Sequence, residues 1–354
     1  MQVGLKSKAV AMIECILTID YEIYGNGEGS LKDLVYEPAQ RIKEIFLRWD
    51  RRFVVFVEVA ELEMIEAKGA DLAINLVKNQ IRDFHKEGFE IGLHLHPWWY
   101  NAHCENGGWI LDYSEYNLCT LPRERIAQII DRGISYLREI LGESDFTPLA
   151  HRAGHLLFQN TQAAAKVLAE RGIKVDSSVY KGGLWGQHNL DYRPALRNGY
   201  NWRFTDDINV PDSQGVLLEL PIHTQMVPIW KMFTTKRIGL QQKGSSATQS
   251  GKKILSRMRD FLRFRYPLKF DLCQMSLKEL TAMVDAVLLE DQQIPESFRP
   301  IVAIGHTKDL VDFETVESFL DYLNEKEIKI STFEKVYPKC KTEFKRGMNN
   351  INRI

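Results

Sequence analysis

Two histidines stand two residues apart in an apolar run, FEIGLHLHPWW, at residues 89–99. Residues i and i+2 of a strand point to the same side, so His94 and His96 project together from one face. That spacing suits two imidazole ligands on one divalent cation such as zinc, which also accepts carboxylate oxygen and keeps a position open for water in catalytic sites. Asp20 and Glu22 repeat the spacing at the end of an earlier apolar run. One carboxylate could complete the ligand set, and the other could act as a base beside the water.

The competing interpretation is that these are hydrogen-bonded core histidines and surface carboxylates. A single histidine on an apolar strand is usually a core histidine of this kind, because buried polar groups find partners. Two pairs with matched spacing, together with His306 at the end of a third apolar run, favour the metal site.

Apolar, β-branched runs alternate with segments of helical periodicity along the chain. This alternation predicts parallel strands joined by right-handed crossovers. The number of units favours a (β/α) barrel of seven or eight strands over an open sheet, so the expected fold class is α/β. The predicted strands cover residues 12–20, 53–60, 89–96, 147–152, 173–179, 215–222 and 300–306, with 327–332 as a candidate eighth. The predicted helices cover residues 37–50, 71–87, 122–141, 160–171, 276–290 and 314–325.

Ionisable residues gather at the predicted carboxyl ends of five strands. In barrels and in open α/β sheets alike, functional groups collect at that end. One such residue means little, but the same pattern on five strands indicates a site. The residues are Asp20 and Glu22, His94 and His96, His151 and Arg152, Asp176, and His306.

Arg152 and His306 each have two interpretations. Arg152 could be an ordinary surface cation, or it could hold a base carboxylate ionised and oriented by charge and hydrogen bonds. His306 could cap the last helix, or it could protonate a leaving group, since histidine titrates near neutral pH.

Length and composition restrict the class of protein. The 354 residues carry 46 basic and 47 acidic side chains, so the overall charge gives no nucleic-acid footprint. The five cysteines are dispersed without a C-x-x-C pair, which favours a reducing compartment. No apolar run reaches about 18 residues, and Glu14 interrupts the N-terminal one. We therefore expect neither a membrane span nor a signal peptide, but a cytoplasmic protein.

One domain is expected over residues 1–337, followed by a flexible tail over 338–354. Two insertions interrupt the domain, at about 180–214 and 224–275, and the first is typical of a long functional loop. Within the second, residues 252–265 form a basic amphipathic stretch. It could pack on the barrel with a solvated basic face, which is the commoner arrangement, or it could rest on the anionic surface of the inner membrane.

The order of these motifs resembles the polysaccharide deacetylase superfamily with NodB homology, a group of metal-dependent carbohydrate esterases, over roughly residues 12–310. The family's apolar strand that ends in Thr-Phe-Asp-Asp reads LTIDYE here, and its motif that closes on His-Pro reads GFEIGLHLHP. HRAGH, DSSVY and IVAIGH follow at the places of the family's arginine, Asp-Ser-Ser and final histidine motifs. This variant has Asp-Tyr-Glu in place of paired aspartates. Its histidines are two apart, where the family's metal histidines lie about one helical turn apart.

The resemblance implies a distorted (β/α) barrel that removes an N-acetyl group from an amino sugar in a bacterial surface glycan or its precursor. It implies Asp20 as the general base braced by Arg152, His306 as the general acid, and a divalent metal ion, expected to be Zn²⁺. The departures from the family pattern leave open an exchange of roles between Asp20 and Glu22. The implied metal ligands are Glu22, His94 and His96.

Tryptophans in the predicted loops could stack on sugar faces, and they could equally anchor packing. Two other functions remain, namely a metal-dependent amidohydrolase that acts on a non-sugar amide and an inactive, carbohydrate-binding relative. The presence of Asp20, Arg152 and His306 counts against the inactive relative. The candidate substrate-contacting residues are Trp98, Trp99, Asp176 and Trp185.

Overall fold

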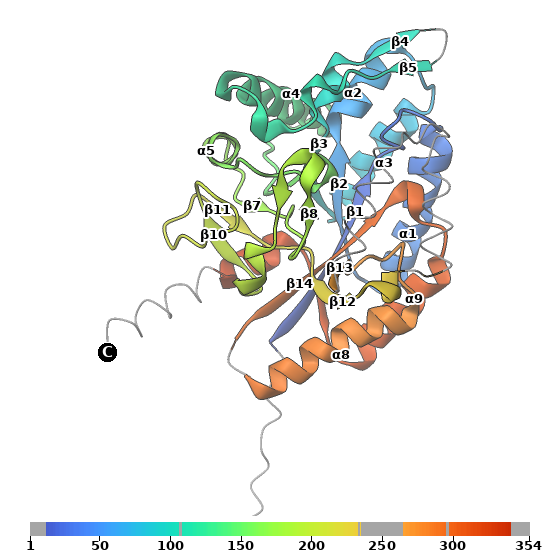
Figure 1. Cartoon of the computed structure of the whole chain (residues 1–354). Helices are drawn as coiled ribbons and strands as arrows, with labels where there is room; N and C mark the ends of the chain where they lie inside the picture. The colour runs from blue at the N-terminus through green and yellow to red at the C-terminus, as the bar shows by residue number, and fades with distance from the viewer. Residues whose placement is uncertain (1–11, 106–107, 233, 235–264, 295–296, 341–354) are drawn as a thin grey trace, which may run out of the picture.

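The computed structural model describes residues 12–105, 108–232, 234, 265–294 and 297–340. They show the expected alternation of strands and helices, with a nine-stranded sheet at the centre (Figure 1). Its central strands are buried throughout, as parallel strands covered by helices must be. The strands of the sheet are β1 (Ile13–Tyr21), β2 (Val54–Glu58), β3 (Glu90–Leu95), β6 (Ala150–Ala153), β7 (Val175–Asp176), β10 (Trp202–Phe204), β11 (Leu217–Glu219), β14 (Arg299–His306) and β15 (Lys329–Ser331).

The sheet curls, and the chain that follows β11 bridges to β14, which makes a distorted barrel. The strand order is β10-β11-β7-β6-β3-β2-β1-β14, and β10 with β11 is the antiparallel pair. Just after β11, Ile222 forms single parallel bridges with Tyr180 and with Val302 of β14. Across this junction the backbone N–H of His223 donates to the Val302 carbonyl at 2.9 Å. The fold class expected from the sequence, α/β with a distorted (β/α) barrel, is confirmed.

The run at 327–332 forms a strand, but this strand does not become an eighth strand in the ring of the barrel. Its strand, β15, pairs with residues 14–16 in the first half of β1. β2 pairs with β1 over residues 18–21. β15 therefore extends the sheet at the amino end of β1, below the level at which the functional groups were expected.

Helices cover the outer face of the sheet. In Figure 1, α4 and α2 lie at the top, α3 and α1 lie at the right, and α8 and α9 run together below. The sequence pattern predicts every long helix except α2, because the apolar run at 53–60 continues past the end of β2. That strand ends at Glu58, whose carboxylate caps α2 by accepting the Ala60 N–H at 3.2 Å. The helices are α1 (Glu37–Arg48), α2 (Val59–Lys68), α3 (Ile74–Lys86), α4 (Arg123–Leu141), α5 (Gln162–Glu170), α8 (Leu277–Gln293) and α9 (Phe313–Glu325).

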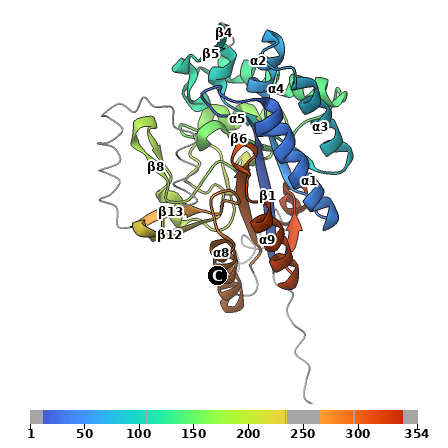
Figure 2. The ribbon, with the colours of Figure 1, turned by 90° about the vertical axis from the view of Figure 1, so that its right-hand side faces the viewer.

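Both predicted insertions contain short hairpins. The insertion at 180–214 pairs β8 (Leu184–Trp185) with β9 (Leu190–Asp191) and also supplies the edge strand β10. In the insertion at 224–275, β12 (Thr224–Pro228) pairs with β13 (Arg265–Lys269). Figure 2 shows β8, β12 and β13 on the side of the sheet away from α1 and α3. A third hairpin, of β4 (His103–Glu105) and β5 (Gly108–Ile110), follows β3.

Two other sequence predictions concern segments that are only partly described. Of the basic stretch at 252–265, all but the last residue lies outside the described residues, so a membrane contact there stays a prediction. The predicted tail begins too early, because residues 333–340 are helical. Phe333, Val336 and Cys340, at helical spacing, are buried in one apolar cluster. No helix among the described residues is long and apolar enough to cross a membrane.

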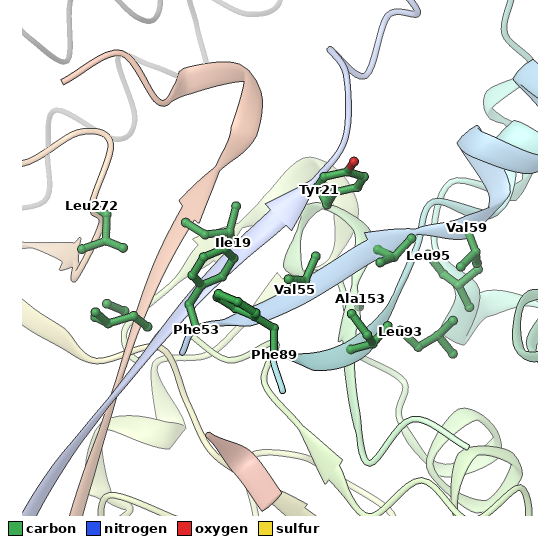
Figure 3. Packing of buried hydrophobic residues seen from close by; sticks show 14 of the residues in the cluster. Ile19, Tyr21, Phe53, Val55, Val59, Phe89, Leu93, Leu95, Ala153 and Leu272 are labelled. Atoms are coloured by element: carbon green, nitrogen blue, oxygen red, sulfur yellow. The ribbon is translucent and has the colours of Figure 1, made fainter. Parts of the chain in front are cut away.

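Side chains alternate along each central strand between the helix-covered face and the barrel interior. Ile19, Val55 and Leu93, from β1, β2 and β3, form part of the apolar layer under the helices (Figure 3). A second apolar cluster fills the lower interior of the barrel, so polar side chains on the inner face gather above it. That cluster includes Ile16, Val54, Phe56, Ala150 and Val175.

Candidate active site

The inner faces of four strands bring ionisable side chains to one end of the barrel. Asp20 of β1 lies in register with His306 of β14, and His94 of β3 lies in register with Arg152 of β6. Asp20, His94 and Arg152 are buried, whereas His306 is partly exposed. Asp20, His94 and His306 border a cavity of about 320 Å³ together with Glu22. The ionisable residues predicted at these strand ends therefore lie together at one end of the barrel.

Glu22, His94 and His96 place three potential metal-ligating atoms around one point. Oε2 of Glu22 lies 3.4 Å from Nε2 of His94 and 3.4 Å from Nδ1 of His96. Nitrogen and oxygen ligands about 2.0–2.1 Å from a zinc ion in a tetrahedral site are themselves roughly 3.3–3.4 Å apart. The spacing of these side chains therefore fits a tetrahedral ion.

The surroundings of both imidazoles also fit metal ligands. Nδ1 of His94 donates to the backbone carbonyl of Arg152 at 2.8 Å, which leaves Nε2 as the atom that faces Glu22. Nδ1 of His96 is buried and has no hydrogen-bond partner among the described residues. Such an orphaned nitrogen beside a carboxylate is expected where a cation binds. Gly154 makes room for the His96 ring, because a Cβ at that position would collide with it.

The electrostatics favour a positive charge between these residues. Burial alone would raise the pKa of Glu22, but the Lys308 ammonium and the two imidazoles hold that pKa well below its usual value. Burial would lower the pKa of His94, but Asp20 and Glu22 raise it to about 9. Burial lowers the pKa of His96 to about 3, so this ring is neutral. Glu22 and His96 are therefore in the forms that bind a divalent ion, and His94 must release its proton when an ion binds.

Asp20 is held by Arg152. Nη1 of Arg152 donates to Oδ1 of Asp20 at 2.5 Å and to Oγ1 of Thr18 at 2.9 Å. The same guanidinium donates from Nε to the Ser177 carbonyl at 3.0 Å and lies 4.1 Å from the ring centre of Phe56. Burial would raise the pKa of Asp20, but the charges of Arg152, His94 and His306 together lower that pKa, so Asp20 stays ionised as a general base must.

His306 faces Asp20 from the neighbouring strand. Nε2 of His306 lies 3.6 Å from Oδ2 of Asp20, and Nδ1 lies 4.0 Å from Oδ2 of Asp309. The His306 side chain is 17% exposed and borders the cavity. An imidazole between carboxylates and a cavity is placed to pass a proton to a bound molecule.

The tryptophans predicted to contact substrate lie in two different environments. Trp185 of β8 borders the cavity, as expected. Trp98 and Trp99 are fully buried, because the tight 3-10 turn at Pro97–Asn101 folds both rings inward. Trp98 stacks on Tyr116 with ring centres 4.8 Å apart. The structure therefore gives Trp98 and Trp99 packing positions in place of the predicted substrate contacts.

Asp176 was also expected to face the substrate, but its side chain is buried away from the cavity lining. One of its oxygens accepts from Nδ1 of His151 at 2.7 Å, and the other accepts the Ser178 N–H at 3.0 Å. These bonds join β6 to β7 beneath the site. The predicted substrate contact of Asp176 is corrected to a structural one.

Sequence analysis missed two charged residues that touch the metal-ligand cluster. Glu58, at the end of β2, accepts the His96 N–H at 3.0 Å, and its Oε2 lies 3.6 Å from Nδ1 of that ring. Lys308 donates to Oε1 of Glu22 at 2.7 Å. Both residues could have been predicted from the sequence. Glu58 is the last residue of a strand, and Lys308 stands two residues after His306.

Three further residues with polar side chains border the cavity and lack a strand-end signal in the sequence. Tyr180 and Lys269 come from the two insertions, and His155 follows β6. His155 has a left-handed backbone, with φ of 52°, which is strained for a residue with a side chain. Strain of this kind concentrates at functional sites, so it accords with the place of His155 beside the cavity.

A larger cavity of about 800 Å³ lies between α8 and the chain after β11. Its charged side chains have hydrogen-bond partners: Glu290 accepts from Tyr200 at 2.7 Å, Arg299 donates to Asp291 at 2.5 Å, and Lys181 donates to the Asn198 carbonyl at 2.5 Å. No set of candidate metal ligands lies there within the described part of the chain. We therefore assign the chemistry to the smaller cavity.

Neither a protein-family model nor a curated protein matches this sequence. Solved structures nevertheless share its fold. A protein of Mycobacterium smegmatis that is described as a polysaccharide deacetylase superposes with a TM-score of 0.53 at 14% identity, over 96% of this chain and 93% of its own. The barrel implied by the motif resemblance is therefore the fold that the chain adopts.

Enzymes that catalyse other reactions share this fold. A branching enzyme of Pyrococcus horikoshii has a TM-score of 0.51 at 10% identity, over 92% of this chain and 70% of its own. A 4-alpha-glucanotransferase of Thermococcus litoralis has a TM-score of 0.50 at 14% identity, over 92% of this chain and 40% of its own. Such a likeness establishes the fold alone, so the activity has to be argued from the side chains.

Proposed function

We propose that this protein is a metal-dependent hydrolase that removes the N-acetyl group from an amino sugar. The observation that carries the proposal is the cluster of Glu22, His94 and His96 next to the ion pair of Asp20 and Arg152. A divalent ion bound there, for which zinc suits the mixed nitrogen and oxygen donors, would polarise the acetyl carbonyl and lower the pKa of water in the site.

The side chains around the cavity supply the proton transfers. Asp20, kept ionised by Arg152, takes a proton from the attacking water. The water oxygen bonds to the acetyl carbon. The amide bond between that carbon and the nitrogen then breaks, and the nitrogen stays on the sugar. His306 donates a proton to the departing nitrogen. The products are acetic acid, which ionises to acetate, and the free amine of the sugar.

The contacts favour Glu22 as the metal ligand and Asp20 as the base. Glu22 lies against both imidazoles, whereas Asp20 lies against Arg152 and His306. A guanidinium bonded to the carboxylate weakens its attraction for a metal ion but keeps it ionised for proton transfer. This supports one of the two role assignments that the sequence leaves open.

An amino sugar is the substrate class that the cavity supports best. Trp185 and Tyr180 offer aromatic faces of the kind on which sugar rings pack. The cavity, at about 320 Å³, is near the lower end of the range for ligand sites, which suits one sugar ring. The surface glycan in which that sugar would occur is proposed from the motif resemblance.

Metal content is the first test of this proposal. The purified chain, reconstituted with zinc and desalted, should retain about one equivalent by elemental mass spectrometry, and His94→Ala/His96→Ala should retain far less. His85→Ala is the matched control, because the His85 side chain on α3 is 30% exposed and hydrogen-bonds to Glu143 at 3.1 Å, away from the candidate ligands. Acetate release from N-acetylated amino sugars should follow the metal content of each variant.

Equal and negligible metal in all three proteins would overturn the mechanism. Bound metal with acetate released only from non-sugar N-acetyl amides would replace the sugar substrate with the amidohydrolase alternative. Bound metal without hydrolysis of either class would favour the inactive, carbohydrate-binding relative.

A further inference from the structure

The direct ion pairs around the cavity leave one lysine without a carboxylate partner among the described residues. Asp20 is matched by Arg152 at 2.5 Å, and Glu22 is matched by Lys308 at 2.7 Å. Lys269 of β13 borders the same cavity and has no ion pair within the described residues. Counted by direct ion pairs, Lys269 is therefore a lysine in excess before any metal binds, and a divalent ion would add positive charge to the same cavity.

The surroundings of Lys269 do not remove this excess. Its Nζ lies 5.6 Å from the ring centre of Tyr180, a cation–π contact that leaves the charge uncompensated. Burial raises the pKa of Asp271, two residues along, and the nearby Lys269 charge opposes that rise. Asp271 is itself buried, and its Oδ1 accepts the N–H groups of Cys273 and Gln274. It does not form a direct ion pair with the lysine.

The same wall of the cavity carries aromatic side chains. Tyr180 and Trp185 border it from the 180–214 insertion, and Lys269 borders it from the next hairpin. A ligand that reaches Glu22 and the two imidazoles in a space of about 320 Å³ also lies beside these three residues. The ligand therefore meets an apolar ring face and an unmatched ammonium group at once.

We propose that the substrate is an anionic amino sugar whose negative group is bound by Lys269. This inference rests on the proposed function for the position of the acetamido group but not for the charge. The negative group is a phosphate ester or a ring carboxylate, since either accepts a hydrogen bond from an ammonium group. A neutral N-acetyl sugar would fill the same space and leave the excess charge without a partner.

Binding measured by calorimetry on the zinc-reconstituted full chain tests this proposal without requiring turnover. The probes are N-acetylglucosamine, its 1-phosphate, its 6-phosphate and the corresponding 6-carboxylate sugar. At least one charged probe should bind about tenfold more tightly than the neutral sugar, the gain expected from one hydrogen bond to a charged group. The charged probe that binds more tightly than the neutral sugar identifies the negative group as a phosphate or a carboxylate.

Lys269→Met should abolish that preference while leaving the affinity for N-acetylglucosamine within about threefold. Lys166→Met is the matched control, because Lys166 lies on α5, is 44% exposed and pairs with Asp206 at 3.6 Å. It removes the same charge from the chain and should keep the preference. Salt up to about 0.5 M should narrow the gap between charged and neutral probes in the wild type only partly, since the lysine is half-buried.

Equal affinity for all four probes, a preference that survives in Lys269→Met, or no binding of any probe would each overturn the proposal. Failure of the proposed function is a separate result. It would appear as the expected order of affinities with no acetate released from any of the four sugars.

Discussion

Nδ1 of His94 donates its hydrogen bond to the backbone carbonyl of Arg152, the residue whose guanidinium holds Asp20. Arg152 thus orients a candidate metal ligand with its main chain and a candidate base with its side chain. Because β3 and β6 are neighbouring parallel strands, the two functions are fixed by one register of the sheet. A side-chain substitution at Arg152 should therefore separate them.

The double variant Arg152→Met/Asp20→Asn should bind metal and lose activity. Arg152→Met alone would leave Asp20 buried and unpaired, which costs about 3–5 kcal/mol, so Asp20→Asn is included to keep the fold. Acetate release should fall at least about a hundredfold, the usual contribution of a general base. Elemental mass spectrometry should still find about one equivalent of metal. Loss of the metal together with activity would contradict the assignment of Asp20 as base.

Gly154→Ala should weaken metal binding while the chain stays folded. The new Cβ would collide with the His96 ring and would lie 2.6 Å from the Leu95 carbonyl, so the ring must move from its position beside Glu22. A competition titration with a chelating dye should show metal affinity reduced by an order of magnitude or more. Gly186→Ala, where a Cβ meets nothing within 4 Å, should bind metal like the wild type.

Trp185→Ala should weaken substrate binding, whereas Trp98→Ala should destabilise the fold. Trp185 borders the cavity and is partly exposed, so its loss should raise KM for the sugar with little change in melting temperature. Trp98 is fully buried, so its loss should destabilise the fold by about 3–5 kcal/mol. Thermal unfolding and steady-state kinetics on both variants distinguish these effects. A large stability loss in Trp185→Ala would mean that this ring is a packing residue as well.

Glu90 should make the protein less stable as the pH rises. Burial raises the pKa of this carboxyl from 4.5 to about 8 in the folded chain, and its Oε1 has no partner among the described residues. The folded form therefore holds the proton more tightly than the unfolded form. The stabilisation is complete below about pH 4.5 and is lost as the pH rises toward and through 8.

Glu90→Gln should remove this dependence, since the amide oxygen can still accept the Glu334 N–H and carries no charge. Its melting temperature should exceed that of the wild type by several degrees at pH 8.5 and match it near pH 5. Glu314→Gln, at an exposed position on α9, should follow the wild type at both values. An equal difference in melting temperature between Glu90→Gln and the wild type at pH 5 would show that the effect does not come from ionisation of Glu90.

The parts of the site that the sequence predicts are those set by strand periodicity. Asp20, His94, Arg152 and His306 stand at inward-facing positions near the carboxyl ends of parallel strands, and register alone brings them together. Glu58 obeys the same rule. It escaped prediction because α2 begins one residue later, so the apolar pattern shows no break at the strand end.

The remaining features depend on contacts between distant segments. Trp98 and Trp99 are adjacent to the metal histidines in sequence, but the turn that follows His96 buries both rings against residues that no local pattern specifies. The same holds for β15, whose apolar run predicts a strand but not the part of β1 that it joins. Lys269 reaches the cavity from a hairpin whose place beside β14 only the folded chain reveals.

The junction that closes the barrel is built differently from the rest of the ring. β1 and β14 pair over eight positions, whereas Ile222 with Val302 and Asp271 with Ile304 are single bridges. Local opening should therefore begin along this junction, and the amide hydrogens of His223 and Leu272 should exchange with deuterium before those of β1 and β3. β14 forms one side of this junction but stays paired with β1, and β3, which carries the candidate metal histidines, lies beyond β2. The barrel can thus loosen on the side of the insertions, where a sugar would enter, while the spacing of its catalytic strands is preserved.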